Sequence, residues 1–303
     1  MSIIWDLHLA YFLTYHFKFI SMKNFKKIIA VIFVVVISSC EDVQDFDQEE
    51  SEPVVEAFIY EGEPIDDVYL KKTVPFTAGR DIEPEPITDA NISISNGSQN
   101  FVLSQKTKEP GRYYYDGTDL SINVGDMYQL SFEYEDKIIS SSTTIPSKPN
   151  GVSISTNLIE IPQINSFQDL RSFRESFRET IDVNWINDDG SYYYLVIKNT
   201  EKRPISIDPT DILGSLDINF EYTTEPTQQS IFQIRPMIHY SQYGQHKVTI
   251  YKVNKEYALL YETSTQDSRD LNEPYTNINN GLGIFSGFTS QVLYFYVVGN
   301  SYY

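Results

Sequence analysis

Few residues of this sequence are equipped for nucleophilic or metal chemistry. Its 303 residues include one cysteine, Cys40, and four histidines. A single cysteine excludes an intramolecular disulfide and a zinc site with four cysteine ligands. His239 and His246 are the only histidines after the first forty residues, and neither matches the HExxH spacing of a metal-binding helix. We interpret both as surface or network histidines. No Gly-x-Ser-x-Gly nucleophile elbow occurs, since Gly287–Ser290 departs from that pattern.

Paired carboxylates are the second chemical possibility. The 42 Asp and Glu residues include the adjacent pairs Asp66–Asp67 and Asp188–Asp189. Both pairs fall in predicted turns, where solvent keeps carboxylates ionised, whereas a general acid needs a pKa raised by burial or by a close like charge. We therefore expect a chain that is not an enzyme and holds no cofactor and no metal. A carboxylate-based hydrolase acting on glycan or peptide is the alternative.

Tyrosine is the abundant aromatic residue, with 23 copies against two tryptophans. The runs Tyr113–Tyr115 and Tyr192–Tyr194 lie in predicted strands, so alternate rings point to opposite faces of a sheet. One face would pack inward, and rings on the other could stack on a sugar, a peptide or a partner protein. The simpler interpretation is that tyrosine is a good strand former on a half-exposed sheet.

Residues 1–39 are predicted to be a signal peptide. Lys23, Lys26 and Lys27 form a positive region, and Ile28–Ile37 is an uninterrupted apolar run of the length found in secretory signals. A membrane-spanning helix needs about 20 apolar residues. Because Met22 begins a complete signal of its own, we expect it to be the true start, with residues 1–21 placed upstream of it by an early start codon.

The end of this segment, Ile37–Cys40, resembles the lipobox of bacterial lipoproteins. The resemblance implies cleavage before Cys40 and lipidation of its thiol, so the expected first partner is the outer membrane, reached through acyl chains on Cys40. More than one acyl chain gives a stable anchor. A buried structural cysteine behind a plain cleavable signal is the alternative.

Acidic residues dominate the remaining chain. The formal net charge of the whole chain, −19, excludes a free-standing nucleic-acid binder, which needs a basic face. Residues 41–52 carry acids and no base, so self-repulsion predicts an extended tether after Cys40. This run resembles the surface-export signal of Bacteroidota lipoproteins, which implies an outer-membrane protein exposed on the cell surface.

Alternating apolar residues from Pro53 onward predict a mainly β fold of two antiparallel, immunoglobulin-like β-sandwiches. We expect the first sandwich over residues 53–146, a linker over 147–151, and the second over 152–303. Turn signals at Asn96-Gly97 and Glu135-Asp136 predict hairpins. Within the second sandwich we expect an inserted loop over 200–229 and a helix over Lys255–Thr263. The chain should end in two strands, Leu282–Phe288 and Val292–Val298.

Residues 167–177 have two interpretations. Phe167, Leu170, Phe173 and Phe177 fall near one side of a helix, which favours a short amphipathic helix. The same stretch could instead run as an extended lead-in to the strand that begins at Ile181.

Several segments together are similar to one known family. They are the lipobox at Cys40, VVEAFIY (54–60), GQHKVTIYKVNKEYALLY (244–261) and NEPYTNINNGLGIFSGF (272–288). They resemble an uncharacterised lipoprotein family of Bacteroidota, classed as a domain of unknown function and often encoded beside TonB-dependent receptors. The resemblance covers roughly Cys40 to Val298 and implies a β-sandwich protein with an accessory role in uptake, whose partner is a TonB-dependent receptor. It supplies no catalytic residue.

The glycine-rich end of that resemblance has a structural interpretation. Asn279–Gly281 can take left-handed backbone conformations at a turn, and Gly283 and Gly287 allow close approach to another backbone. No lysine follows at P-loop spacing.

The expected function is therefore a lipid-anchored cell-surface protein without catalytic activity, working as an accessory binding component with a TonB-dependent receptor in nutrient uptake. A hydrolase is the first alternative, and a structural or adhesive envelope protein is the second.

Overall fold

The computed structural model describes residues 51–74, 82–176, 179–212, 221–264 and 274–299, and Ser51–Tyr303 form one compact unit. The predicted signal peptide, Cys40 and residues 41–50 of the predicted tether lie outside the described residues. Among the described helices, none is long and apolar enough to cross a membrane. The fold is mainly β, as predicted, with several antiparallel sheets and short helices.

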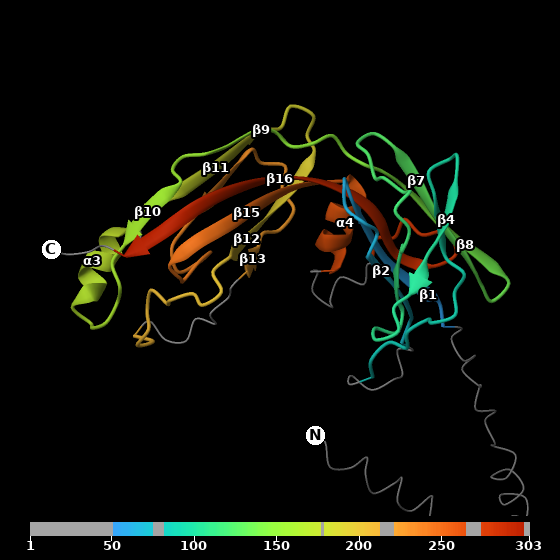
Figure 1. Cartoon of the computed structure of the whole chain (residues 1–303), viewed down its shortest axis with the longest axis horizontal. Helices are drawn as coiled ribbons and strands as arrows, with labels where there is room; N and C mark the ends of the chain where they lie inside the picture. Colours follow the sequence, from blue (N-terminus) through green and yellow to red (C-terminus); the bar gives the residue numbers. More distant parts are fainter. Residues whose placement is uncertain (1–50, 75–81, 177–178, 213–220, 265–273, 300–303) are drawn as a thin grey trace, which may run out of the picture. The chain divides into compact units, whose positions relative to one another are not determined.

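The elements follow one another along the chain as Figure 1 shows. The strands and helices are β1 (Pro53–Tyr60), β2 (Asp67–Lys72), β3 (Ser93–Ser95), β4 (Asn100–Val102), β5 (Ser104–Gln105), β6 (Arg112–Tyr114), β7 (Met127–Tyr134), β8 (Lys137–Thr144), β9 (Asn150–Ile154), β10 (Leu158–Ile161), α3 (Asp169–Ser176), β11 (Ile181–Ile186), β12 (Tyr192–Asn199), β13 (Glu221–Thr223), β14 (Ile231–Ile234), β15 (Gly244–Val253), α4 (Lys255–Ser264) and β16 (Leu282–Gly299).

Local turn and helix signals are confirmed. The β3–β4 hairpin turns at Gly97, where φ is +85°, and the Asn96 side chain accepts hydrogen bonds from the backbone amides of Ser98 and Gln99. Glu135 and Asp136 both adopt positive φ between β7 and β8. Residues 169–176 are helical rather than extended, and the Asp169 carboxylate accepts the backbone N–H groups of Asn165 and Ser166 ahead of the helix.

Three sheets make up the described chain. A nine-stranded sheet has the order β13-β12-β15-β16-β1-β2-β6-β5, with β10 also pairing with β16. A four-stranded sheet has the order β4-β3-β7-β8, and a three-stranded sheet has the order β14-β11-β9. All pairings between these strands are antiparallel except those of β16 with β1 and with β10, which are parallel.

One strand replaces the two predicted at the end of the chain. β16 runs unbroken for 18 residues, because Thr289–Gln291 contains no glycine, proline, asparagine or aspartate and stays paired with β15. Its first part pairs with β1, from Val54 opposite Leu282 to Tyr60 opposite Phe288. Its second part pairs with β15 and β10. β16 therefore belongs to both parts of the nine-stranded sheet.

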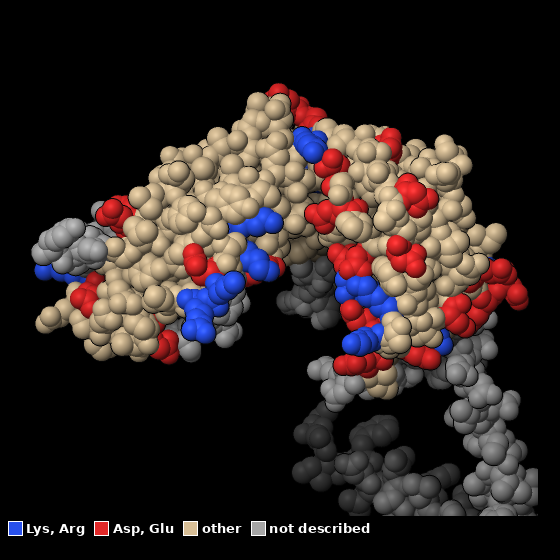
Figure 2. Space-filling model, viewed as in Figure 1, with Lys and Arg blue, Asp and Glu red and all other residues tan. Residues whose placement is uncertain are grey.

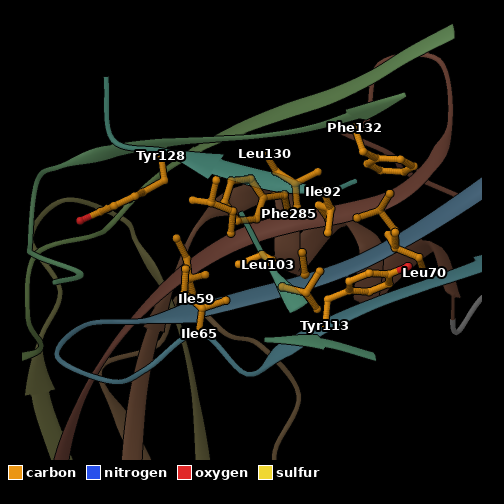
Figure 3. Packing of buried hydrophobic residues seen from close by; sticks show 14 of the residues in the cluster. Ile59, Ile65, Leu70, Ile92, Leu103, Tyr113, Tyr128, Leu130, Phe132 and Phe285 are labelled. Carbon is orange, nitrogen blue, oxygen red and sulfur yellow. The ribbon is translucent and has the colours of Figure 1, made fainter. Parts of the chain in front are cut away.

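A first hydrophobic cluster lies between the β1–β2–β6 part of the nine-stranded sheet and the four-stranded sheet. Figure 3 shows Leu70, Leu130 and Phe285 among the side chains that converge from these layers, and all three are at most 1% exposed. Burying one such side chain contributes about 1.5–3 kcal/mol. Phe285 comes from β16, far along the chain from the other members.

A second hydrophobic cluster lies between the β12–β15–β16 part and the three-stranded sheet. Leu195, Ile250 and Phe295 come from the large sheet, Trp185 comes from β11, and Phe173 comes from α3. The division into two separate domains stays a prediction, since β16 contributes Phe285 to the first cluster and Phe295 to the second.

The predicted linker is tied to both parts of the nine-stranded sheet. The Ser147 hydroxyl accepts a hydrogen bond from Lys252 Nζ at 2.9 Å, and its carbonyl accepts one from the Thr289 hydroxyl at 3.0 Å. Lys148 pairs with Glu61 at 3.0 Å. β9 begins at Asn150, so regular structure resumes within the predicted linker.

The asparagine–glycine segment before β16 has the structural role expected for it. The Asn277 side chain bonds both the N–H and the carbonyl of Phe285, at 2.9 Å each. Asn280 adopts φ +60°, and its amide donates to the Ile138 carbonyl on β8. Gly283 has φ +103°, and a Cβ there would lie 2.0 Å from the Val55 carbonyl oxygen. Only glycine permits this approach of β16 to β1.

Gly283→Ala tests this close approach. We expect a loss of at least about 4 kcal/mol of unfolding free energy, because the new methyl group meets backbone atoms as well as a left-handed φ. Gly62→Ala is the matched control, since Gly62 also has positive φ (+74°) but nothing lies within 4 Å of a new Cβ. The control should lose about 1–2 kcal/mol. Equal losses by urea denaturation would show that the approach of β16 to β1 is not constrained there.

Candidate binding face of the nine-stranded sheet

One face of the nine-stranded sheet, which we call the outer face, carries several aromatic residues that a ligand could reach. The opposite, inner face packs into the second hydrophobic cluster through Leu195, Ile250 and Phe295. Side chains alternate along each strand, so the ladder registers define the outer face. Its members include Phe58 and Tyr60 on β1; Tyr192, Tyr194, Val196 and Lys198 on β12; Gln245, Lys247, Thr249 and Tyr251 on β15; Phe288, Ser290, Val292, Tyr294, Tyr296 and Val298 on β16; and Leu158 and Glu160 on β10.

An aromatic cluster occupies the end of the outer face next to α4. The Tyr194 ring stacks on Tyr251 at 4.8 Å between centroids, and Tyr60 stacks on Phe288 at 5.0 Å. Tyr257 of α4 covers the cluster with an edge contact to Phe288 at 5.1 Å. Burial raises the pKa of Tyr60 and Tyr194 well above the ordinary tyrosine value, so both phenols stay neutral. These rings pack mainly on one another.

An exposed stripe continues the outer face along the second part of β16. Val292, Tyr294, Tyr296 and Val298 are 39%, 47%, 44% and 37% exposed, and Leu158 of the neighbouring β10 is 49% exposed. The Tyr296 hydroxyl accepts a hydrogen bond from Gln245 Nε2 at 2.6 Å. Large apolar side chains so exposed and contiguous are a common mark of a binding surface.

The tyrosine runs singled out from the sequence are mostly used for packing. Tyr193 is on the inner face, beside Trp185 at 5.5 Å, and Tyr194 is in the aromatic cluster. Tyr113 is buried in the first cluster, where its hydroxyl donates to the Ile87 carbonyl. The exposed pair Tyr294 and Tyr296 was not predicted. The alternation within LYFYV was visible, but nothing in it shows which face lacks a covering layer.

Three of the four carboxylates considered as candidate acids, Asp66, Asp67 and Asp189, are held by basic side chains. Arg112 contacts both Asp66 and Asp67 at 3.1 Å. Asp189 pairs at 2.7 Å with Lys252, whose side chain is 7% exposed, and this hydrogen bond lowers the pKa of Asp189 to about 2. Asp189 therefore stays ionised at neutral pH and is unsuited to act as a proton donor.

The two histidines lie in separate aromatic settings. His239 accepts the Arg235 backbone N–H at 2.8 Å and contacts Tyr222. His246 is 2% exposed and stacks on Phe295 at 4.9 Å. Burial lowers the pKa of each to about 4, so both are neutral at pH 7. Within the described ranges, no group of three or more His, Cys, Asp or Glu side chains is placed to hold a metal ion.

Two open cavities lie near the first hydrophobic cluster, away from the stripe residues. One of about 470 Å³ has Lys72, Glu85, Glu133 and Glu135 in its lining. The other, of about 370 Å³, is lined in part by Glu61, Glu63 and Tyr115. Their acidic character matches the charge of the whole chain.

These features define a mainly β protein whose large sheet leaves an aromatic face open. The chain belongs to the DUF4249 family, described as a domain of unknown function, whose model matches residues 41–292. No match was found among curated proteins.

Solved structures give only distant likenesses. The FN1–FN3 domains of chicken CNTN1 are 8% identical, with 82% of this chain and 67% of that one covered and a TM-score of 0.26. A multi-domain segment of titin is 10% identical, with 68% and 61% covered and a TM-score of 0.19. At these scores neither likeness bears on the function.

The buried His246 predicts acid sensitivity. Its pKa in the folded state lies below the unfolded value of about 6.5, so the unfolded chain binds the proton first as the pH falls. Its contribution to stability is complete above pH 6.5, and about 2 kcal/mol of it is lost by pH 5. In urea denaturation, His246→Gln should therefore reduce the loss between pH 7 and pH 5 by about that amount.

His239→Gln is the comparison variant, because His239 shares the lowered pKa but is only half-buried. The double variant should show the flattest pH profile. If the His246→Gln profile runs parallel to that of the unmodified protein, the buried neutral imidazole is not the cause of the acid sensitivity.

Proposed function

We propose that this protein is anchored by acyl chains on Cys40 in the outer membrane, faces the cell surface, and works as a non-catalytic binding component beside a TonB-dependent receptor. The observation that carries this proposal is the position of the single cysteine. Cys40 ends a signal-like segment with a lipobox pattern, and the family match begins at the next residue, 41. The segment before Cys40 thus lies outside the family domain, as a removable signal would.

Binding rather than catalysis is favoured by the chemistry of the described residues. Asp66 and Asp67 are paired with Arg112, and Asp189 is paired with Lys252. The histidines are engaged in aromatic contacts. The stripe on β16 is exposed and open to a ligand. An accessory protein held at the membrane by a tether can present such a face to a solute or to a receptor.

Cys40→Ala tests the anchor. Cells expressing the unmodified protein and fed a labelled fatty acid should yield a labelled, membrane-bound product, whereas the variant should lose the label, because only a thiol accepts the lipid. Ser39→Ala is the matched control, since it keeps both a small residue and the cysteine. Equal labelling of the Cys40 variant would refute the lipoprotein assignment.

Protease treatment of intact cells tests the direction the protein faces. A surface-exposed protein should be digested while periplasmic proteins survive. Full protection of the mature chain in intact cells, with digestion only after lysis, would place it on the inner side.

A further inference from the structure

We propose that the exposed stripe of the outer face, with Tyr294, Tyr296 and Lys247 at its centre, binds a short acidic saccharide. This deepens the proposed binding function and rests on it, because it names the class of ligand that the face would take.

The tyrosines supply a stacking platform. Tyr294 and Tyr296 point to the same side of β16, two residues apart, which places their Cα atoms about 7 Å apart along the strand. Both rings are nearly half exposed, and Val292 and Val298 extend the surface at either end. Aromatic rings stack on the apolar faces of sugar rings, and the phenolic hydroxyl leaves a polar group for the sugar's own hydroxyls.

The platform is held in place before any ligand arrives. The inner face beneath it is closed by Phe295 and Val297, which are at most 1% exposed. Gln245 Nε2 donates to the Tyr296 hydroxyl, and Gln245 Oε1 accepts from the Thr200 hydroxyl at 2.9 Å. Little side-chain freedom is left to lose around Tyr296, and pre-organisation of this kind favours binding.

The positive charge of Lys247 beside the tyrosines favours an anionic ligand. Lys247 lies directly opposite Tyr294 on one side and opposite Lys198 on the other. Like charges directly opposite in a ladder destabilise it. Lys198 is neutralised by Glu221 at 2.8 Å, whereas Lys247 has no ion pair within the described part of the chain. In Figure 2, basic side chains gather where Figure 1 draws β12, β13 and β15, although the chain as a whole carries −19.

The form of the surface favours a saccharide over other anions. Extended peptides bind by pairing with free sheet edges, but β15 and β16 are interior strands whose backbone groups are already paired. A nucleic acid brings many phosphates, and the acidic chain repels them. A carboxylated sugar needs one cation beside a stacking surface, which matches Lys247 directly opposite Tyr294.

The test uses the full-length protein in detergent and calorimetric titration with short oligogalacturonides. Their methyl esters are the matched ligand control, because they keep the sugar rings and lose the carboxylates. The free acids should bind, and Tyr294→Ala and Tyr296→Ala should each weaken binding about tenfold. Lys247→Gln should weaken it about threefold and remove most of its salt dependence. Ile138→Ala on β8 and Lys108→Gln, both exposed, should change nothing.

Each other outcome overturns the proposal. Equal binding of esters and acids would refute the role of Lys247. Acid binding that survives both tyrosine substitutions would place the site elsewhere. Absence of binding to any saccharide by a protein that still carries its fatty-acid label would refute the saccharide while leaving the anchored, receptor-associated function standing. Loss of the fatty-acid label would instead refute the anchored function on which this proposal rests.

Discussion

The described fold depends on the pairing of one long strand with two partners. β16 pairs with β1 in the parallel direction and with β15 in the antiparallel direction. It contributes Phe285 to one hydrophobic cluster and Phe295 to the other. Neither part of the nine-stranded sheet is complete without it, so the last strand of the chain must be in place before either cluster is fully buried. Pairings this distant in sequence form slowly because of their loop-closure cost.

The segment before β16 is specialised for this pairing. Asn277, Asn279 and Asn280 supply side-chain hydrogen bonds to β16 and β8, and Gly283 allows backbone contact with β1. The Thr143 hydroxyl of β8 accepts bonds from both Gly287 and Asn254. The residues that carry the family resemblance therefore join β8, β1 and the start of α4, and their sequence pattern needs no ligand to explain it.

Local signals in the sequence predicted much of this structure. Alternation located most strands, the Asn96-Gly97 and Glu135-Asp136 turns located two hairpins, and the helix over residues 255–264 was anticipated closely. The pairing of strands that are distant in sequence was not predictable. The alternation of apolar and polar side chains defines the two faces of a strand, but it does not define which strand lies beside it. The parallel β1–β16 pairing and the continuity of β16 through Ser290 are of this kind. For the same reason the sequence drew attention to Tyr193 and Tyr194, which are buried, rather than to Tyr294 and Tyr296, which are exposed.

The pairing of β16 with both parts of the sheet also links the fold to the proposed function. A strand fixed in two hydrophobic clusters holds its outer side chains in position, so the stripe on β16 is presented by a rigid sheet rather than by loops. We therefore expect Ser51–Tyr303 to unfold as one cooperative unit.

The most direct measurement uses Trp185 in the second cluster as the reporter, because the other tryptophan of the sequence, Trp5, lies in the predicted signal peptide. Leu130→Ala removes a fully buried side chain from the first cluster, at a cost of about 2–5 kcal/mol. We predict that in Leu130→Ala the urea midpoint reported by Trp185 fluorescence falls together with the midpoint reported by circular dichroism. An unchanged Trp185 midpoint, with circular dichroism divided into two transitions, would contradict it.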